Sequence, residues 1–226
     1  MNLPYPTLAR EGWPMLALSV AAALLTTAAL GLGMVSGLCW LAAMLIAGFF
    51  MHAPRHVPSQ AGAVLAPADG RIERIEHARD PYTDREALVI SVIMQAFRVH
   101  PSRACVDGIV QQVQYFPGTP FARELVNRLP ASASASVSQS SQERSAVVID
   151  SHGRTVTLVQ VAGLLARRIL CHARPGQVLT RGQRYGGVRF GSRVDVYLPI
   201  DAMPRVAPGD RVSATTTILA TLPTTA

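Results

Sequence analysis

Hydrophobic and polar positions divide the chain into two regions with different patterns. No charged residue occurs in Trp13–Met51, and a glycine-containing stretch, Gly31–Gly37, interrupts this apolar run near its middle. Each half, about 13–30 and 35–51, is long enough to cross a bilayer at a helical rise of about 1.5 Å per residue. We therefore expect residues 1–56 to form a membrane anchor, a transmembrane helical hairpin.

Two other interpretations of the apolar run fit it less well. A signal peptide has a shorter apolar region and no second apolar segment directly after it. A buried helical hairpin carries polar positions at helical spacing. Arg10 precedes the run and Arg55 follows it, whereas the connecting loop has no charge. This distribution predicts that both termini lie on the cytoplasmic side of the cell (inner) membrane, together with the domain that follows.

The remaining residues, 57–226, have the pattern of a β-rich domain. Short runs rich in Val and Ile alternate there with Gly, Pro and Asp, which is typical of strands separated by turns. A short helix is expected at about 120–127, and the Ser/Ala-rich segment 131–141 is expected to be a surface loop. The predicted class is α+β with no doubly wound pattern. The expected strands are about 63–65, 71–75, 87–93, 109–115, 146–149, 155–161, 166–170, 188–190, 193–198 and 211–219.

An internal similarity links two segments of this domain. Arg174–Gly182 resembles Ala207–Thr215, with Thr215 standing where the first segment has Gly182. Both segments suit a turn followed by a strand, as in the half-units of lipoyl-like hammerhead domains. The chain has no lysine to carry a lipoyl group, so the similarity predicts architecture and no carrier function.

Charge and composition narrow the possible chemistry. The net charge is +7, and all 21 basic residues are arginines. Without lysine the chain has no internal Schiff base to pyridoxal phosphate and no biotinyl attachment site. We find no nucleic-acid recognition motif, and a basic domain beside a membrane more simply faces anionic headgroups. Cys39, Cys105 and Cys171 match no zinc spacing, so no metal site is predicted and each is expected to be a buried or membrane-embedded thiol.

A Gly-Ser pair inside the strand-like run Val188–Tyr197 is the candidate for chemistry. Taken alone, Gly191-Ser192 indicates a turn. Four other segments accompany this pair; in order along the chain they are Ala66-Pro67-Ala68-Asp69-Gly70, Val99-His100-Pro101-Ser102-Arg103-Ala104-Cys105-Val106-Asp107-Gly108, the fainter Ser141-Gln142-Glu143-Arg144, and Gln160-Val161-Ala162-Gly163-Leu164-Leu165-Ala166-Arg167-Arg168-Ile169. In combination with them, Gly191-Ser192 resembles the self-cleavage site of the phosphatidylserine decarboxylase family, in its short proenzyme form with a membrane hairpin.

The resemblance implies a proenzyme that cleaves itself between Gly191 and Ser192. The products are a β chain (1–191) and an α chain (192–226), which stay together as a heterodimer. Ser192 is the nucleophile of the cleavage and is then converted to a pyruvoyl group, the covalent cofactor. Its ketone forms an imine with the amine of phosphatidylserine, and loss of CO₂ gives phosphatidylethanolamine.

A base and a carboxylate complete the implied site. Removing the proton of a serine hydroxyl requires a base, and a carboxylate orients that base. The matched segments imply His100 as the general base and Asp69 as the residue that orients it. The matches run from about Phe49 to the C-terminus and so cover most of the chain.

The sequence departs from the family pattern at three positions near the predicted base. Phe97 stands where a polar residue or histidine is usual, and Ser102 and Cys105 replace the usual Asn and Pro. Two alternatives therefore stay open: a decarboxylase of another serine-headed lipid, such as an archaetidylserine-like ether lipid, and a membrane-anchored β domain without enzymatic activity. The sequence also leaves a higher oligomer open.

Overall fold

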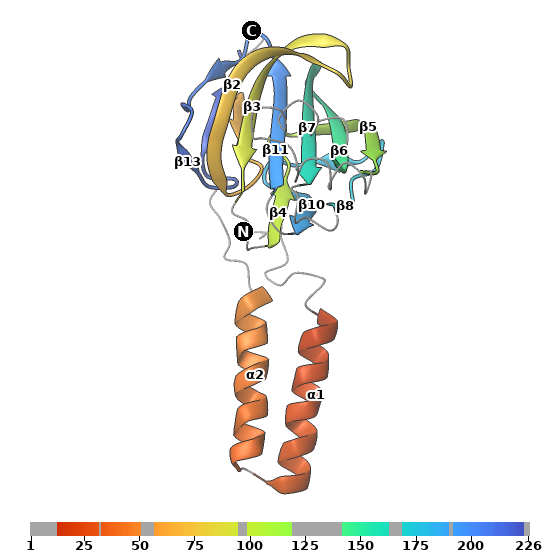
Figure 1. Ribbon diagram of the computed structural model, residues 1–226, viewed down its shortest axis with the longest axis vertical. Helices are drawn as coiled ribbons and strands as arrows, with labels where there is room; N and C mark the ends of the chain where they lie inside the picture. The colour runs from red at the N-terminus through yellow and green to blue at the C-terminus, as the bar shows by residue number, and fades with distance from the viewer. Residues whose placement is uncertain are drawn as a thin grey trace, which may run out of the picture. The chain divides into compact units, whose positions relative to one another are not determined.

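The computed structural model describes residues 13–31, 33–50, 57–94, 99–118, 142–162, 169–189 and 192–223 (Figure 1). Contacts divide the chain into two compact units, Met1–Arg55 and His56–Ala226. Each unit is described by itself.

The first unit is a pair of helices, α1 (Trp13–Leu30) and α2 (Met34–Phe50). Both helices lie where the apolar pattern predicts them. At the start of α2, the Ser36 hydroxyl accepts a hydrogen bond from the Gly33 N–H at 2.9 Å, which satisfies a backbone donor as a capping box does. The Trp40 indole donates to the Thr27 hydroxyl across the pair at 3.2 Å. Within the described residues, neither helix has the combined length and apolar character required for a membrane crossing, so the predicted transmembrane hairpin is not confirmed.

The second unit consists of strands arranged in three sheets (Figure 1). An eight-stranded sheet has the order β13-β2-β3-β11-β7-β6-β5-β9, and two three-stranded sheets have the orders β4-β10-β8 and β1-β14-β12. The strands are β1 (Ala63–Leu65), β2 (Gly70–Asp80), β3 (Arg85–Ile93), β4 (Val99–Arg103), β5 (Gly108–Phe116), β6 (Arg144–Ser151), β7 (Arg154–Ala162), β8 (Ile169–Cys171), β9 (Val178–Leu179), β10 (Arg184–Arg189), β11 (Ser192–Pro199), β12 (Met203–Pro204), β13 (Arg211–Val212) and β14 (Ile218–Thr221). The predicted β-rich character of this unit is confirmed.

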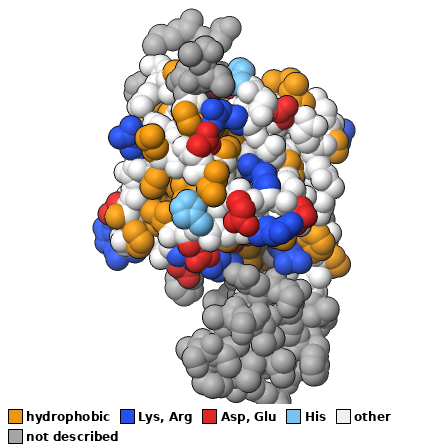
Figure 2. Space-filling model, turned by 90° about the horizontal axis from the view of Figure 1, so that it is seen from above, with side chains coloured by type: hydrophobic (Ala, Val, Ile, Leu, Met, Phe, Trp, Pro, Cys, Tyr) orange, Lys and Arg blue, Asp and Glu red, His pale blue; other side chains and the backbone are white. Residues whose placement is uncertain are grey.

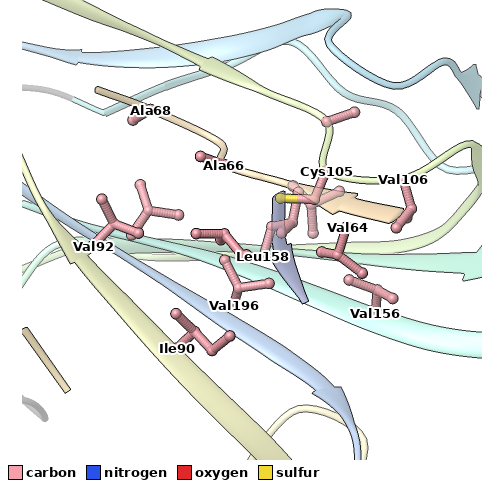
Figure 3. Packing of buried hydrophobic residues seen from close by; sticks show 14 of the residues in the cluster. Val64, Ala66, Ala68, Ile90, Val92, Cys105, Val106, Val156, Leu158 and Val196 are labelled. Atoms are coloured by element: carbon pink, nitrogen blue, oxygen red, sulfur yellow. The ribbon is translucent and has the colours of Figure 1, made fainter. Parts of the chain in front are cut away.

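The eight-stranded sheet curls around a single large hydrophobic core. Side chains alternate along each strand, so one face of β7 contributes Val156 and Leu158 to this core. Figure 3 shows these two residues packed with Val64, Val196 and Cys105 from neighbouring elements. The opposite face, which we call the outer face, carries a smaller cluster of Ala146, Val159 and Val161 and charged side chains such as Arg193 and Asp195. The central strands β3, β6 and β7 are buried along most of their length, on both faces.

The eight-stranded sheet is built from two similar halves. β13 lies against β2 as β9 lies against β5, and β2 against β3 as β5 against β6. The pairs β2–β3 and β5–β6 have a bulge at the same place, directly after Ile72 in β2 and after Val110 in β5. The Ile72 N–H donates to the Asp210 carbonyl and the Val110 N–H to the Gln177 carbonyl, each at 2.9 Å. These features define equivalent positions, with Ile72 equivalent to Val110.

The turns around the edge strands β9 and β13 are equivalent as well. Gly176 and Gly209, which precede these strands, have φ values of 80° and 93°. Gly182 and Thr215, which follow them, have φ values of 79° and 67°. The similarity between the two sequence segments therefore extends to their backbone conformation, including a threonine in the left-handed region that normally favours glycine.

The structure also corrects the strand predictions at particular places. The predicted strand 211–219 is wrong as a single element: β13 and β14 are separated by the turn that contains Thr215. β4 was not predicted from the strand pattern, because it contains Pro101 and lacks a regular apolar alternation. The predicted helix at 120–127 and the predicted loop at 131–141 lie outside the described residues.

Candidate active site

The strand that contains His100 is bound to the strand that leads to the Gly-Ser pair. β10 lies between β4 and β8, with Val188 paired with His100 on one side and with Ile169 on the other. Directly paired residues of antiparallel strands have Cα atoms about 4.5–5.5 Å apart. The backbone of His100 is therefore next to a residue only three positions before Gly191.

Ser192 is the first residue of β11, in the middle of the eight-stranded sheet. It pairs with Ala162 of β7, and Arg193 pairs with Ile93 of β3. Figure 1 shows the small sheet of β4, β10 and β8 at the end of the curled sheet where β11 begins. Gly191 itself lies outside the described residues.

Asp69 lies in the short connection between β1 and β2. Its Oδ1 accepts a hydrogen bond from the Ala214 N–H at 2.9 Å. The same connection is bound to β4, because the Arg103 N–H donates to the Pro67 carbonyl at 2.9 Å. Asp69 is thus held by the turn after β13 and lies beside the strand that carries His100.

The sheet register places Asp69 and Ser192 at the same end of the sheet. Ile93, the last residue of β3, pairs with Arg71 of β2 on one side and with Arg193 of β11 on the other. Asp69 precedes Arg71 by two residues, and Ser192 precedes Arg193 by one. Neighbouring strands are about 4.8 Å apart, so the two strands that flank β3 are separated by about 10 Å.

The structure therefore brings the backbones of Asp69, His100 and Ser192 to one end of the domain. The side chains of His100 and Ser192 lie outside those the structure describes, as does Phe97. The hydrogen bonds of an Asp–His–Ser arrangement consequently stay a prediction.

Three buried polar residues at this end were not predicted as site residues. Gln160 and Ser102 are fully buried, and the Gln160 Nε2 donates to the Ser102 Oγ at 2.7 Å. Glu143 is 7% exposed, and its Oε1 accepts from the Ile169 N–H at 3.0 Å and from the Tyr115 hydroxyl at 2.9 Å. The sequence offered one signal for this site, a glutamine inside the otherwise apolar run of β7. Its hydrogen-bond partner, Ser102 on β4, is 58 positions away in the sequence.

Cys105 follows β4 closely but belongs to the core. It is completely buried, and this burial raises the pKa of its thiol. A protonated thiol surrounded by apolar side chains is a poor nucleophile. Cys105 is therefore a packing residue, as expected from the sequence.

On the outer face, arginines and carboxylates lie side by side. Arg193 contacts Asp195 at 2.9 Å, and Arg74 contacts Glu76 at 2.8 Å. Figure 2 shows basic and acidic side chains interleaved with apolar ones on the face it presents. These arginines neutralise the carboxylates beside them. The net charge of +7 therefore comes from arginines outside such pairs.

Comparison with known proteins gives a consistent result. The sequence model of the family described as phosphatidylserine decarboxylase matches residues 43–220. A phosphatidylserine decarboxylase proenzyme of Paraburkholderia xenovorans is 52% identical over 223 residues, which cover 98% of this chain and 100% of the relative. Phosphatidylserine decarboxylase proenzymes of Burkholderia mallei and Burkholderia pseudomallei are each 54% identical over 224 residues, 99% of both chains.

Proposed function

The chain belongs to the phosphatidylserine decarboxylase family, and from this premise we propose how its residues carry out the decarboxylation of phosphatidylserine to phosphatidylethanolamine and CO₂. The chain is a carboxy-lyase of phospholipid biosynthesis that is made as a proenzyme. One observation carries the assignment of the site: segments that are distant in the sequence meet where β11 begins, with Val188 paired with His100 and Ser192 paired with Ala162.

Maturation is an internal acyl shift followed by an elimination. The Ser192 Oγ attacks the Gly191 carbonyl, forming an ester while the amide C–N bond breaks and the nitrogen takes up a proton. Loss of the Ser192 α-proton then breaks the Cβ–O bond, which releases the Gly191 carboxylate and leaves dehydroalanine. Addition of water and loss of ammonia convert this residue to a pyruvoyl group. A glycine at position 191 suits the first step, because it adds no side chain around the tetrahedral centre.

His100 and Asp69 supply the proton transfer that this sequence requires. In this proposal His100 removes the proton of the Ser192 hydroxyl, and Asp69 orients the imidazole. The backbone positions support these roles, because β4 pairs with β10 and is also bound to the Asp69 connection through Arg103 and Pro67.

The pyruvoyl group, once formed, supplies an electron-withdrawing carbonyl for the amine of phosphatidylserine, which allows the substrate carboxylate to leave as CO₂. The chain contains no lysine that could compete for this carbonyl. Ser192, the residue proposed to carry the group, is the first residue of β11, a strand that is paired with β3 and β7.

The two chains formed by cleavage are proposed to remain a heterodimer. The α chain would contain β11, β12, β13 and β14, and β11 lies between β3 and β7 of the β chain. β13 pairs with β2, and β14 pairs with β1. Separating the chains would break these backbone ladders and expose core residues such as Val194 and Leu198, so one covalent bond can be lost without loss of the fold.

The helix pair α1–α2 is proposed to hold the enzyme at the cell (inner) membrane, with the catalytic domain on the cytoplasmic side. Large apolar side chains are exposed along both helices, among them Leu18, Leu25, Met34 and Met44. An exposed apolar surface of this extent favours insertion into lipid. A diacyl lipid substrate resides in the same bilayer, so the anchor and the substrate share one location.

The deciding experiment is the mass of the purified protein under denaturing conditions, together with a decarboxylation assay on phosphatidylserine and on an ether lipid with a serine headgroup. We expect two fragments that divide between Gly191 and Ser192, the smaller lighter by one ammonia than a peptide that begins with serine. We also expect release of CO₂ from phosphatidylserine. A single uncleaved chain of 24.2 kDa that still decarboxylates would contradict the pyruvoyl mechanism.

A further inference from the structure

Three polar side chains are buried side by side where the two sheets of the site meet. Ser102 of β4, Ser145 of β6 and Gln160 of β7 are each 0% exposed, and we call them the polar trio. Gln160 pairs with Ser145 across β6 and β7, and its Nε2 donates to the Ser102 Oγ at 2.7 Å. Gln160 stands between Leu158 and Ala162 on the face that packs into the main core. The trio is thus a polar island in an apolar interior.

The other half of the domain shows what the fold itself requires at these positions. Leu198 pairs with Leu88 in β11 and β3 as Gln160 pairs with Ser145 in β7 and β6. The bulges after Ile72 and Val110 are equivalent. Counting along the ladders from these bulges shows that the two pairs occupy equivalent positions. Where the second half has glutamine and serine, the first half has two leucines, both in the main core.

The third member of the trio has an apolar equivalent too. The Ala104 carbonyl accepts a hydrogen bond from Gly182 at 2.8 Å, and the Ala66 carbonyl accepts one from Thr215 at 2.9 Å. This makes Ser102, two residues before Ala104, equivalent to Val64. Val64, Leu88 and Leu198 are each no more than 3% exposed, and we call them the apolar trio. The fold therefore accepts apolar side chains at all three places.

Hydrogen bonding within the polar trio is incomplete. The Gln160 Oε1 and the Ser145 Oγ are buried and have no hydrogen-bond partner among the described residues. A buried polar atom without a hydrogen-bond partner lowers the stability of the fold. Stability alone would therefore favour the apolar side chains of the other half, and the glutamine requires another explanation.

That explanation lies in where the Gln160–Ser102 bond is placed. Gln160 precedes Ala162, the partner of Ser192, by two residues, and Ser102 follows His100 by two residues. β4 and β7 belong to different sheets, which share no ladder among the described residues. The bond is thus a direct side-chain connection between the strand of the base and the strand beside the nucleophile.

We propose that Gln160 and Ser102 are positioning residues for the self-cleavage at Ser192. The hydrogen bond between them fixes β4 against β7 and thereby sets the distance between His100 and Ser192. This inference rests on the proposed function, since it assumes cleavage between Gly191 and Ser192. Loss of the bond slows maturation because a small displacement of a base from its nucleophile lowers the rate of proton transfer strongly.

The test copies two members of the apolar trio, Leu198 and Val64, into the second half and leaves Ser145 unchanged. The double variant Gln160→Leu/Ser102→Val is expected to unfold at the same temperature as the wild type or higher, while its cleavage is slower by about tenfold or more. The side chains of threonine and valine have nearly the same shape, and only threonine keeps the hydroxyl group of Ser102. We therefore expect Ser102→Thr to cleave at nearly the wild-type rate and Ser102→Val to cleave slowly.

Thr157→Val is the matched control. Thr157 lies in the same strand β7, is fully buried, and donates to the Asp80 Oδ2 at 2.6 Å. Its replacement removes a buried hydrogen bond away from Ser192, so it should lower the unfolding temperature and leave the cleavage rate unchanged. Cleavage is followed by mass spectrometry on proenzyme produced by cell-free synthesis, with the unfolding temperature measured on the Ser192→Ala form of each variant.

Each outcome decides a separate question. A wild-type chain that does not cleave would contradict the proposed function itself. If the wild type cleaves and the double variant cleaves equally fast, the positioning role is wrong. The role is also wrong if Thr157→Val slows cleavage as much as Ser102→Val, or if Ser102→Thr cleaves as slowly as Ser102→Val.

Discussion

The connection that contains Asp69 and the one that contains Asp107 occupy equivalent places in the two halves of the domain. The Asp69 Oδ1 accepts from the Ala214 N–H at 2.9 Å, and the Asp107 Oδ1 accepts from the Arg181 N–H at 2.8 Å. Each aspartate is followed by a glycine, Gly70 or Gly108. A Cβ atom on either glycine would overlap with a carbonyl oxygen of the next strand.

The difference between the two connections lies in their surroundings. Arg181 also forms an ion pair with Asp107 at 2.7 Å, whereas the equivalent position beside Asp69 is Ala214. The Asp69 connection is bound to β4, and the Asp107 connection is bound to β1 by the equivalent bond from Leu65 to Cys105. The fold therefore explains an Asp-Gly pair in both places. The copy proposed to act in catalysis differs from the other in having Ala214 where the other has Arg181, and in being bound to the strand that contains a histidine.

The largest expected effect comes from the first residue of β11. The register makes Ser192 equivalent to Arg154, the first residue of β7. Ser192→Ala removes the nucleophile, so we expect no cleavage and no decarboxylation, measured as intact mass and released CO₂. Arg154→Ala, which removes only a partly exposed ion pair with Asp201, should cleave normally. Two fragments from the Ser192→Ala chain would refute the assignment.

The second-largest effect is expected at His100, a histidine that has no counterpart in the other half. His100 is equivalent to Gly62. His100 lies three residues before Arg103, whose N–H binds the Asp69 connection, and Gly62 lies three residues before Leu65, whose N–H binds the Asp107 connection. His100→Ala should slow cleavage by about 100-fold or more, as expected for loss of a general base. Imidazole added to the medium is expected to restore part of the rate. Normal processing of His100→Ala would remove this residue from maturation.

The third effect tests the two aspartates directly. Asparagine keeps the oxygen that accepts the backbone hydrogen bond but has no charge. Asp69→Asn should therefore slow cleavage by about tenfold or more through the loss of a charge beside the base. Asp107→Asn should cleave normally and lose only the ion pair with Arg181. Equal cleavage rates in the two variants would show that the halves do not differ in this respect.

A fourth prediction is that the two glycines behave alike. Gly70→Ala and Gly108→Ala both force a methyl group against a carbonyl oxygen, and each should reduce the free energy of unfolding by about 3 kcal/mol. Denaturant unfolding of the Ser192→Ala form measures this loss without interference from cleavage. A small loss in one variant and a large one in the other would mean that the two backbones are less similar than described.

The smallest effect is expected at the turn after β13. Thr215 has φ 67°, where its equivalent is Gly182. Thr215→Gly relieves the strain of a branched side chain but removes a side chain that is only 1% exposed, so it should change the free energy of unfolding by less than about 1 kcal/mol. The reverse exchange, Gly182→Thr, adds the strain without this compensation and should lower the free energy of unfolding by about 1–2 kcal/mol. A loss in Thr215→Gly as large as that in Gly182→Thr would contradict the strain argument.

The sequence predicted the elements with a clear period and missed those without one. The apolar runs located α1 and α2, and the alternating Val- and Ile-rich runs located the long strands. β4 was missed because Pro101 and the polar residues around it weaken the strand pattern. β13 and β14 were merged because threonine gives no signal for a left-handed turn.

The site could be predicted only as a set of segments. Resemblance to a family selected Asp69, His100 and Ser192, but no local pattern shows that their segments meet at one end of a sheet. The Gln160–Ser102 bond joins residues 58 positions apart. Such a contact follows from the sheet register and has no counterpart in the spacing of the residues.

The position of β11 links the maturation of a newly made chain to its folding. Ser192 acquires its neighbours only when β11 has paired with β3 and β7, and β3 lies about a hundred residues earlier in the chain. These long-range pairings are among the slowest contacts to form. Under the proposed mechanism, a chain that fails to form them would also fail to convert Ser192 to the pyruvoyl group. Cleavage between Gly191 and Ser192 would then mark, irreversibly, the chains that have completed this part of the fold.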